Sequence, residues 1–487
     1  MNWKLILKVI SILLFILGIA MIPAMLTSLS YGEIEEAFAF FKTAGSLCAI
    51  CLCGIIFIRP ESKTLHPRDG YLIVALCWIL CSLIGALPFV LSGYTNSFID
   101  AFFESCAAFT TTGATVMIVE FIPKGIMMWL AISHWLGGMG ILVFAISLLP
   151  ALGIAGQNIF KAESPGLQVT KMTTRISDNA KILYLMYIGL SIIEFCMLML
   201  GGMGVFDAII NTLGSISTSG LFSHSEGLAY YDSVYVELIL AIFTIFASIN
   251  FSLYHLLLRG RIVDITKDIE LRVFIFIILC TSTLIGLNLY FTNTYESFGD
   301  IVRYSLFQVT SFATTSGYAV IDYTVWPTFS KALLFILMFI GGCGASTCGS
   351  IKVVRIIVAV KLVLRNIYQR LHPRAVVAVK VGGKAISAPV VSQVTSFIFT
   401  FFLIFLVGSI ILSLQGLDIT TTVSSAIAML SNTGLSFGAV GATSNYSVFC
   451  PALRLVLCLL MLIGRLEIFT ILFLFAPSFW NHSKATS

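Results

Sequence analysis

Four short segments of this 487-residue chain have residue types that can coordinate a cation. Each segment places two small polar residues directly before a glycine. The triplets are Thr111-Thr112-Gly113, Thr218-Ser219-Gly220, Thr315-Ser316-Gly317 and Asn432-Thr433-Gly434. Glycine adopts a positive φ at little cost, so it lets consecutive backbone carbonyls turn toward one axis. Rings of carbonyls that replace a hydration shell form cation filters, so we predict that these triplets line one filter.

The spacing of the triplets indicates a fourfold internal repeat. Successive glycines lie 107, 97 and 117 residues apart, and each interval holds two long apolar stretches. Successive triplets therefore share one orientation and can surround an axis along the membrane normal. A Gly-Gly pair also follows the triplet glycine by 24 residues in the first and third repeats, at Gly137-Gly138 and Gly341-Gly342.

Each triplet follows an apolar stretch that opens with an aspartate: Asp100, Asp207, Asp300 or Asp418. We expect these stretches to be short helices capped by the aspartates, which accept hydrogen bonds from first-turn amides and complement the helix dipole. The partly negative carboxyl ends would then point toward the glycine segments. Non-helical backbone at membrane depth is tolerated only where it lines a cavity, which favours four re-entrant pore loops.

The composition indicates a chain that resides in lipid. Hydrophobic residues make up 58% of it and charged residues only 10%. A bilayer-spanning helix needs about 20 apolar residues. Ten such stretches occur, at about 5–29, 37–58, 71–93, 124–150, 182–203, 234–258, 272–292, 329–360, 389–413 and 449–476. We therefore predict an all-α polytopic membrane protein with ten spans, of which the first is a span and not a signal peptide.

The charges predict an orientation. With a cytoplasmic amino terminus and ten crossings, 22 of the 28 lysines and arginines fall on the cytoplasmic side, as the positive-inside rule requires. Both termini are then cytoplasmic. The net charge of +5 reflects this topology and does not indicate nucleic-acid binding. No GxxxxGK[ST] motif occurs, so we expect any nucleotide to be bound by a partner.

The stretch 329–360 is a poor helix interior because each glycine is about 1 kcal/mol worse than alanine. We expect it to break into two helices joined by a loop within the membrane, which acts as a gate. An arginine at similar depth, Arg465, is a functional candidate by default. We expect it to project into the pore and bond to loop carbonyls; the alternative is an ion pair with Glu467. The predicted gate residues are Gly341, Gly342, Gly344, Ala345, Ser346, Thr347, Gly349 and Arg465.

The chain resembles the Trk/Ktr/HKT potassium transporters over nearly its whole length, and most closely their TrkH-like pore-forming subunits. The motifs that carry the resemblance are the four triplets, 135–140 (WLGGMG), 162–166 (AESPG), 341–351 (GGCGASTCGSI) and 464–467 (GRLE). The third triplet, continued by Tyr318, is also similar to the potassium-channel sequence TVGYG. Glycine in all four triplets resembles the potassium-preferring members of the superfamily.

The resemblance implies four span-loop-span repeats around a central pore. These are residues 61–155, 156–262, 263–370 with a broken second helix, and 371–487, after an extra pair of spans in residues 1–60. It implies potassium uptake by a homodimer in the bacterial plasma (inner) membrane, with potassium bound at the triplets. It also implies a cytosolic TrkA-like ring subunit that binds ATP, ADP or NAD, and no covalently bound cofactor.

Three alternatives remain at this point. An ion-coupled potassium symporter, driven by protons or sodium, could use the same architecture. A secondary transporter for a small solute would also use broken helices, although it would not need four like-oriented loops. An intramembrane hydrolase could use Ser346 with His134 or His255, but these residues lie on different apolar stretches and nothing in the sequence brings them together.

Overall fold

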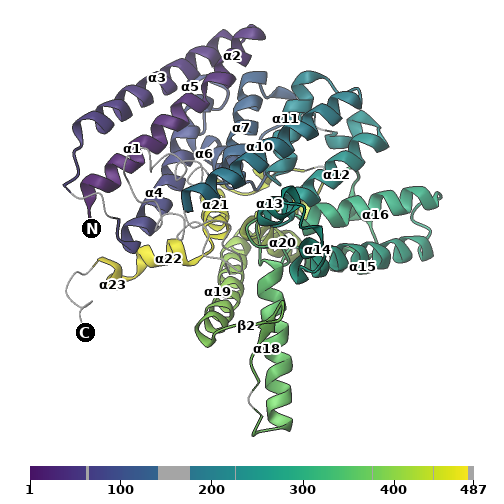
Figure 1. Ribbon diagram of the computed structural model, residues 1–487. Helices are drawn as coiled ribbons and strands as arrows, with labels where there is room; N and C mark the ends of the chain where they lie inside the picture. Colours follow the sequence, from purple (N-terminus) through teal and green to yellow (C-terminus); the bar gives the residue numbers. More distant parts are fainter. Residues whose placement is uncertain (62–64, 141–175, 225, 376, 443, 481–487) are drawn as a thin grey trace.

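The computed structural model describes residues 1–61, 65–140, 176–224, 226–375, 377–442 and 444–480 (Figure 1). Within these ranges the regular secondary structure is helical, apart from an isolated bridge and one antiparallel ribbon of β1 (Lys380–Val381) and β2 (Lys384–Ala385). The end of the predicted span 124–150, the 162–166 motif and the predicted boundary at 155 lie outside the described residues.

The chain begins with a pair of long helical segments that pack against each other. They are formed by α1 (Trp3–Ala20), α2 (Ile22–Ser30) and α3 (Ile34–Phe57). Small residues permit a close approach: Gly18 lies opposite Cys48, and Gly54 lies against Ser11. This pair contacts α4 and α7 and occupies one corner of the molecule (Figure 1).

The rest of the chain repeats one order of elements four times: a long helix, a short helix, an irregular connection and a second long or broken helix. The first pass comprises α4 (Pro67–Gly85), α5 (Leu87–Leu91), α6 (Phe98–Phe109), η1 (Val119–Phe121) and α7 (Lys124–Gly138). The second comprises α10 (Ile176–Leu200), α11 (Val205–Ile216), η3 (Gly227–Tyr231), α12 (Val234–Ser248), α13 (Phe251–Leu258) and α14 (Ile262–Thr266).

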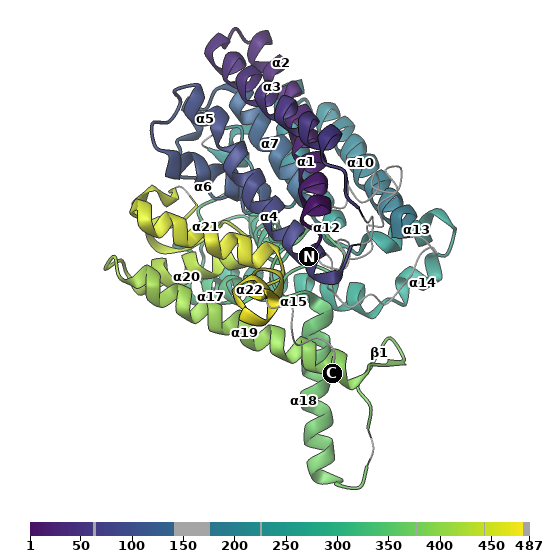
Figure 2. The same cartoon turned by 90° about the vertical axis from the view of Figure 1, so that its left-hand side faces the viewer.

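The third and fourth passes have the same order, with longer extensions after the second helix. The third comprises α15 (Ile269–Phe291), α16 (Phe298–Ala313), η4 (Tyr323–Val325), α17 (Thr328–Leu337) and α18 (Val353–Leu371). The fourth comprises α19 (Ala388–Ser413), α20 (Ile419–Leu430), η5 (Gly438–Val440), η6 (Tyr446–Val448), α21 (Pro451–Arg465), α22 (Phe469–Phe475) and α23 (Pro477–Trp480). The helix α18 projects away from the other helices (Figure 2).

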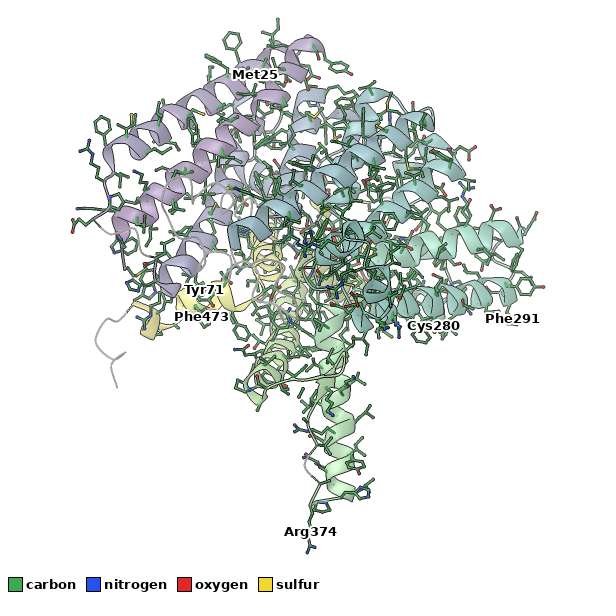
Figure 3. All side chains as sticks on the ribbon, in the orientation of Figure 1. Met25, Tyr71, Cys280, Phe291, Arg374 and Phe473 are labelled. Atoms are coloured by element: carbon green, nitrogen blue, oxygen red, sulfur yellow. The ribbon has the colours of Figure 1, made fainter. Side chains whose placement is uncertain are left out.

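Many large apolar side chains are exposed on the outer surface. On α15, for example, Phe276, Leu279 and Phe291 are more than half exposed. Figure 3 shows Cys280 and Phe291 along this outlying helix. Soluble monomers rarely expose such continuous apolar surface. Together with the helix lengths, this identifies a multi-pass membrane protein.

Six of the described helical segments are long and apolar enough to cross a bilayer, or eight if two bent pairs are each counted as one span. The predicted total of ten is not recovered. The helix α7 ends at Gly138, close to the edge of the described residues, and the stretch 329–360 is divided between α17 and α18. The number of spans therefore stays a prediction.

Two stretches expected to be continuous spans are bent. The pair α12 and α13 turns by 95°, and the pair α21 and α22 turns by 116°. At the second bend, Glu467 and Ile468 both have positive φ, which is rare for a β-branched residue such as isoleucine. The bend lets Phe473 of α22 meet Tyr71 of α4, so the last repeat packs against the first (Figure 3).

Candidate functional site

The four triplets have the same backbone conformation. The first residue of each has a φ between 54° and 55°, and the glycine has a φ between 62° and 76°, whereas the middle residue has no positive φ. Non-glycine residues seldom adopt positive φ. The four residues of the triplets that do so are Thr111, Thr218, Thr315 and Asn432. The same unusual backbone in all four repeats indicates that their loops are structurally equivalent.

The four glycines form a closed ring with the carbonyl that precedes the next glycine along the chain. A Cβ added to Gly113 would lie 1.7 Å from the carbonyl oxygen of Ser219. The corresponding distances are 2.4 Å from Gly220 to Ser316, 2.4 Å from Gly317 to Thr433, and 2.1 Å from Gly434 to Thr112. We call the four triplets, joined by these contacts, the glycine ring. Its last contact joins the fourth repeat to the first, so all four loops surround one axis.

The helices that precede the triplets carry a further set of polar residues that sequence reasoning missed. Nine positions before each glycine lies a buried polar side chain: Glu104, Asn211, Gln308 or Ser425. The constant offset from the glycines was the signal that could have revealed them. These side chains lie on the helices directly before the loops, and Glu104 is the one whose hydrogen bonds to loop backbone are seen among the described residues.

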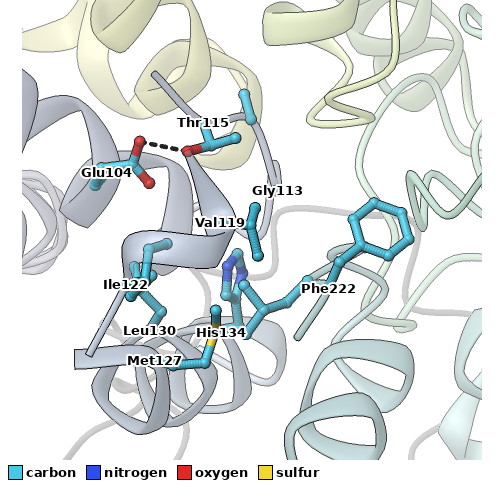
Figure 4. A pocket seen from close by; sticks show the side chains of 12 residues that line it. Glu104, Gly113, Thr115, Val119, Ile122, Met127, Leu130, His134 and Phe222 are labelled. Atoms are coloured by element: carbon cyan, nitrogen blue, oxygen red, sulfur yellow. Dashed lines mark hydrogen bonds between the residues drawn. The ribbon is translucent and has the colours of Figure 1, made fainter. Parts of the chain in front are cut away.

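Glu104 supports the first loop directly. Its Oε1 accepts hydrogen bonds from the Thr115 hydroxyl and the Val116 amide, both at 2.7 Å. Figure 4 shows this contact beside Gly113 and His134, which line a cavity of about 40 Å³. A cavity of this size has room for water. The Nδ1 of His134 is buried, with no hydrogen-bond partner among the described protein groups.

The predicted capping role of the four aspartates is wrong for three of them. Asp418 is the N-cap of α20, where its carboxylate accepts hydrogen bonds from the amide and hydroxyl of Thr421, which hold the pKa of Asp418 below its ordinary value. The other aspartates occupy the third helical position, behind N-caps Ser97, Gly204 and Ser297. A serine three residues before an aspartate is the capping-box pattern, which was readable in the sequence for α6 and α16.

Ion pairs join neighbouring repeats beside the short helices. Asp100 of α6 pairs with Arg454 of α21. Arg303 of α16 forms a bidentate ion pair with Glu237 of α12, in which both N–O distances are 2.6 Å. Each pair links a short helix to the second helix of the preceding repeat, so the pairs help to hold the repeats around the axis.

The third repeat has a non-helical segment between α17 and α18, which we call the 338–352 loop. Its two arms are joined by a parallel bridge between Ile340 and Ile351, in which the Gly341 amide donates to the Ile351 carbonyl at 2.9 Å. Ala345 and Ser350 have positive φ. This is the stretch in which a helix break and gate residues were predicted.

The far end of the loop lies directly against the glycine ring. The Gly349 amide donates to the Thr315 hydroxyl at 2.9 Å. A Cβ on Gly349 would lie 2.1 Å from the Ser431 carbonyl, and one on Gly341 would lie 2.1 Å from the Gly349 carbonyl. The loop therefore packs beneath the third and fourth triplets.

Arg465 is the last residue of α21 and contacts this loop. Its guanidinium donates to the carbonyls of Thr347 at 2.7 Å and Gly138 at 2.6 Å, and also to that of Gly137. Glu467 pairs with Arg355 of α18. Arg465 thus bridges the loop and the end of α7.

The residues of the hydrolase alternative bond to separate groups. The Ser346 hydroxyl donates to the Cys343 carbonyl at 2.6 Å, within its own loop. His134 lines the cavity beside Gly113, and His255 lies in α13. These contacts provide no base for an activated serine.

Three kinds of comparison with known proteins, by family model, by sequence and by structure, agree. The family model described as "TrkH: Cation transport protein" matches residues 38–483. The Trk system potassium uptake protein TrkH of Salmonella typhimurium is 36% identical, with 99% of this chain and 100% of that protein covered. TrkG of Escherichia coli K12, also a Trk system potassium uptake protein, is 34% identical, with 96% and 97% covered. The crystal structure of the potassium transporter TrkH from Vibrio parahaemolyticus superposes with a TM-score of 0.88 at 34% identity, covering 99% and 100%.

Proposed function

This chain belongs to the TrkH family of cation transport proteins, and we propose that it takes up potassium through its glycine ring. The closed circuit of contacts from Gly113 through Gly220, Gly317 and Gly434 back to the first repeat carries the proposal. Such a ring brings the carbonyls of four equivalent loops around one axis. Carbonyl rings replace the hydration shell of a permeating cation, and selectivity follows from their geometry and field strength.

The same proposal assigns the 338–352 loop and Arg465 to the gate. The loop contacts the glycine ring through Gly349 and Thr315. The Arg465 guanidinium bonds to the loop at Thr347 and adds a positive charge beneath the ring. A positive charge on the ion pathway opposes cation passage, and the loop is the adjacent element that can move.

The assembly and orientation follow the family resemblance. We propose a homodimer in the bacterial plasma membrane, with both termini and the tip of α18 in the cytoplasm. Arg370 near the end of α18 is exposed, and so is Arg374, which follows the helix at the tip of this extension (Figure 3), as expected for a cytoplasmic segment. A TrkA-like ring subunit that binds ATP, ADP or NAD would dock on this side and control the gate.

The decisive experiment combines growth and flux. The chain should restore growth of an uptake-deficient bacterium at low potassium. In proteoliposomes it should carry potassium and rubidium faster than sodium. A current that reverses at the potassium equilibrium potential, with or without a proton or sodium gradient, identifies a channel. A reversal potential that moves with the proton or sodium gradient identifies the coupled symporter instead. Absence of potassium flux from correctly inserted protein would contradict the proposal.

A further inference from the structure

The 338–352 loop is held on its side by the bend between α12 and α13 of the second repeat. The Cys343 amide donates to the Ser248 carbonyl at 2.9 Å, and the Thr347 amide donates to the Ala247 carbonyl at 3.3 Å. The Thr347 hydroxyl also donates to the Ala247 carbonyl at 3.0 Å. In the opposite direction, the Phe251 amide donates to the Ala345 carbonyl at 3.2 Å. These bonds join two repeats at backbone level.

The bend makes these groups available. A helix leaves its last carbonyls and first amides without partners inside the helix. Because α12 ends at Ser248 and α13 begins at Phe251, the 95° bend presents both kinds of group at one place. The loop supplies the partners that a continuous helix would have supplied.

A carboxylate from a third element completes the attachment. Glu270 lies in the first turn of α15 and is only 9% exposed. Its Oε1 accepts hydrogen bonds from the Gly344 amide at 2.7 Å and from the Val354 amide at 3.1 Å. Gly344 lies in the loop, and Val354 lies in the first turn of α18. One oxygen therefore ties the loop to the helix that follows it.

We propose that the α12–α13 bend and Glu270 together form a latch that holds the 338–352 loop in the non-conducting state, with Glu270 as a positioning residue that ties the loop to the start of α18. The inference rests on the proposed gating role of the loop and adds the group that holds it. Hydrogen bonds to an ionised acceptor are stronger than neutral ones, so the Glu270 pair contributes disproportionately to holding the loop. The α13–α15 segment connects this latch to the exposed surface at Arg259 and Arg261, so movement there can release the loop.

The test compares three variants of the full chain in proteoliposomes without a cytosolic partner. Glu270→Ala removes both hydrogen bonds and should raise basal potassium flux roughly tenfold, the effect of about one charge-assisted bond. Glu270→Gln keeps one oxygen that can accept both amides but loses the negative charge, so its flux should lie between that of the alanine variant and that of the unmodified chain. Asp268→Ala removes the N-cap of α15, which accepts from the Leu271 amide at 2.8 Å, without touching the loop. It controls for damage to α15 and should not raise flux.

The outcomes separate the latch from the proposed gate. If Arg465→Ala raises flux and Glu270→Ala does not, the latch is wrong and the gate stands. If both raise flux and Glu270→Gln does so equally, hydrogen bonding by Glu270 is not the cause and the latch is again wrong. If potassium passes normally but neither Arg465→Ala nor Glu270→Ala raises flux, the proposed gate is wrong.

A second pair of variants covers the case in which Glu270→Ala does not fold. Phe251 is the first residue of α13, where proline is well tolerated because that amide has no partner within the helix. Phe251→Pro removes the bond to the Ala345 carbonyl, whereas Phe251→Ala keeps it and removes the same aromatic ring. Higher basal flux in the proline variant than in the alanine variant supports the latch. Equal flux contradicts it.

Discussion

The glycine ring and the 338–352 loop are built from the same residue types, yet they are held in different ways. Both contain glycine, serine and threonine, and both contain non-glycine residues with positive φ. In the ring, backbone packs against backbone around a closed circuit. The loop is also attached by a few side-chain hydrogen bonds, from Glu270, Arg465 and Thr315. A large displacement of one corner of the ring collides with the neighbouring loop, whereas the 338–352 loop can be released by breaking individual bonds.

The largest expected effect comes from breaking the ring. Gly113→Ser places a Cβ 1.7 Å from the Ser219 carbonyl, in a conformation that costs an L-residue about 1–2 kcal/mol. The neighbouring carbonyl must shift, so potassium over sodium discrimination should fall by roughly tenfold or more, at about 1.4 kcal/mol per factor of ten. Ion-flux ratios in proteoliposomes measure this.

A matched control uses Gly93, which has a φ of +74° and no atom within 4 Å of its added Cβ. Gly93→Ser bears the same conformational cost without the collision, so its flux ratio should stay unchanged. An unaltered ratio in the Gly113, Gly220, Gly317 and Gly434 variants alike would remove the filter assignment.

The next effect comes from removing Arg465. Arg465→Ala loses the bonds to Thr347, Gly137 and Gly138 together with the positive charge beneath the ring. Basal potassium flux should rise roughly tenfold or more and respond less to a cytosolic partner, because each lost charge-assisted bond is worth about 1.5–3 kcal/mol. Arg465→Lys retains the charge but cannot bond to as many carbonyls, so its flux should lie between. A fall in flux for the alanine variant with normal insertion would contradict the role.

Substitutions at two loop glycines test whether close packing or backbone flexibility makes the loop glycines necessary. A Cβ on Gly349 would lie 2.1 Å from the Ser431 carbonyl, whereas on Gly344 the nearest atom is 3.7 Å away, an ordinary contact. We expect Gly349→Ala to push the loop from the ring and change basal flux, and Gly344→Ala to have little effect. Potassium flux is again the measurement. Equal effects would mean that flexibility, and not contact with the ring, makes the glycines necessary.

The smallest effect concerns the helix caps. Asp418→Ala should destabilise the protein by about 0.5–2 kcal/mol, and Asp418→Ser by less, because serine also caps. Since the pKa of Asp418 is lowered in the folded protein, its contribution is present above the ordinary value of 3.8 and is lost as pH falls through the lowered value. The stability difference between Asp418 and Asp418→Ala should therefore shrink at strongly acid pH, as thermal unfolding would show. A pH-independent difference would argue against the carboxylate cap.

Substitutions at Asp100 provide a second test of the helix caps. It occupies the third position of α6 and pairs with Arg454, so serine cannot replace it. Asp100→Ser and Asp100→Ala should destabilise α6 to a similar extent, unlike the two substitutions at Asp418. Similar behaviour at both sites would contradict the corrected assignment of the caps.

Some features could be predicted from the sequence because they depend on local residue types. The helical membrane class follows from apolar content, and the family resemblance is confirmed by relatives that cover the full chain. The equivalence of the triplets follows from the glycine spacing. The bends after Ser248 and Arg465 could not be predicted, because the segments Ile249-Asn250 and Leu466-Glu467-Ile468 hold no glycine or proline. Tertiary contacts stabilise the bends. At the first bend, for example, amides of the 338–352 loop donate hydrogen bonds to the carbonyls of Ala247 and Ser248.

Partners that are distant in sequence were equally invisible. Glu237 and Arg303, or Glu270 and Gly344, come together only when the repeats pack. The interpretation of the aspartates as caps failed for three of them because their helices begin three residues earlier, at the N-caps Ser97, Gly204 and Ser297, of which Ser97 makes a side-chain capping bond. The role of a side chain in the first turn depends on the residue at which the helix begins. A sequence pattern predicts that starting residue less accurately than it predicts the helix itself.

The polar residues nine positions before the glycines make the four corners of the ring unequal in stiffness. Glu104 anchors the first loop with two short hydrogen bonds. At the third corner, both polar atoms of the Gln308 amide lack a hydrogen-bond partner among the described protein residues. The third loop should consequently fluctuate more than the first, and it is also the loop that rests on the 338–352 segment. The corner that lacks this side-chain anchor is thus the one that contacts the segment below it.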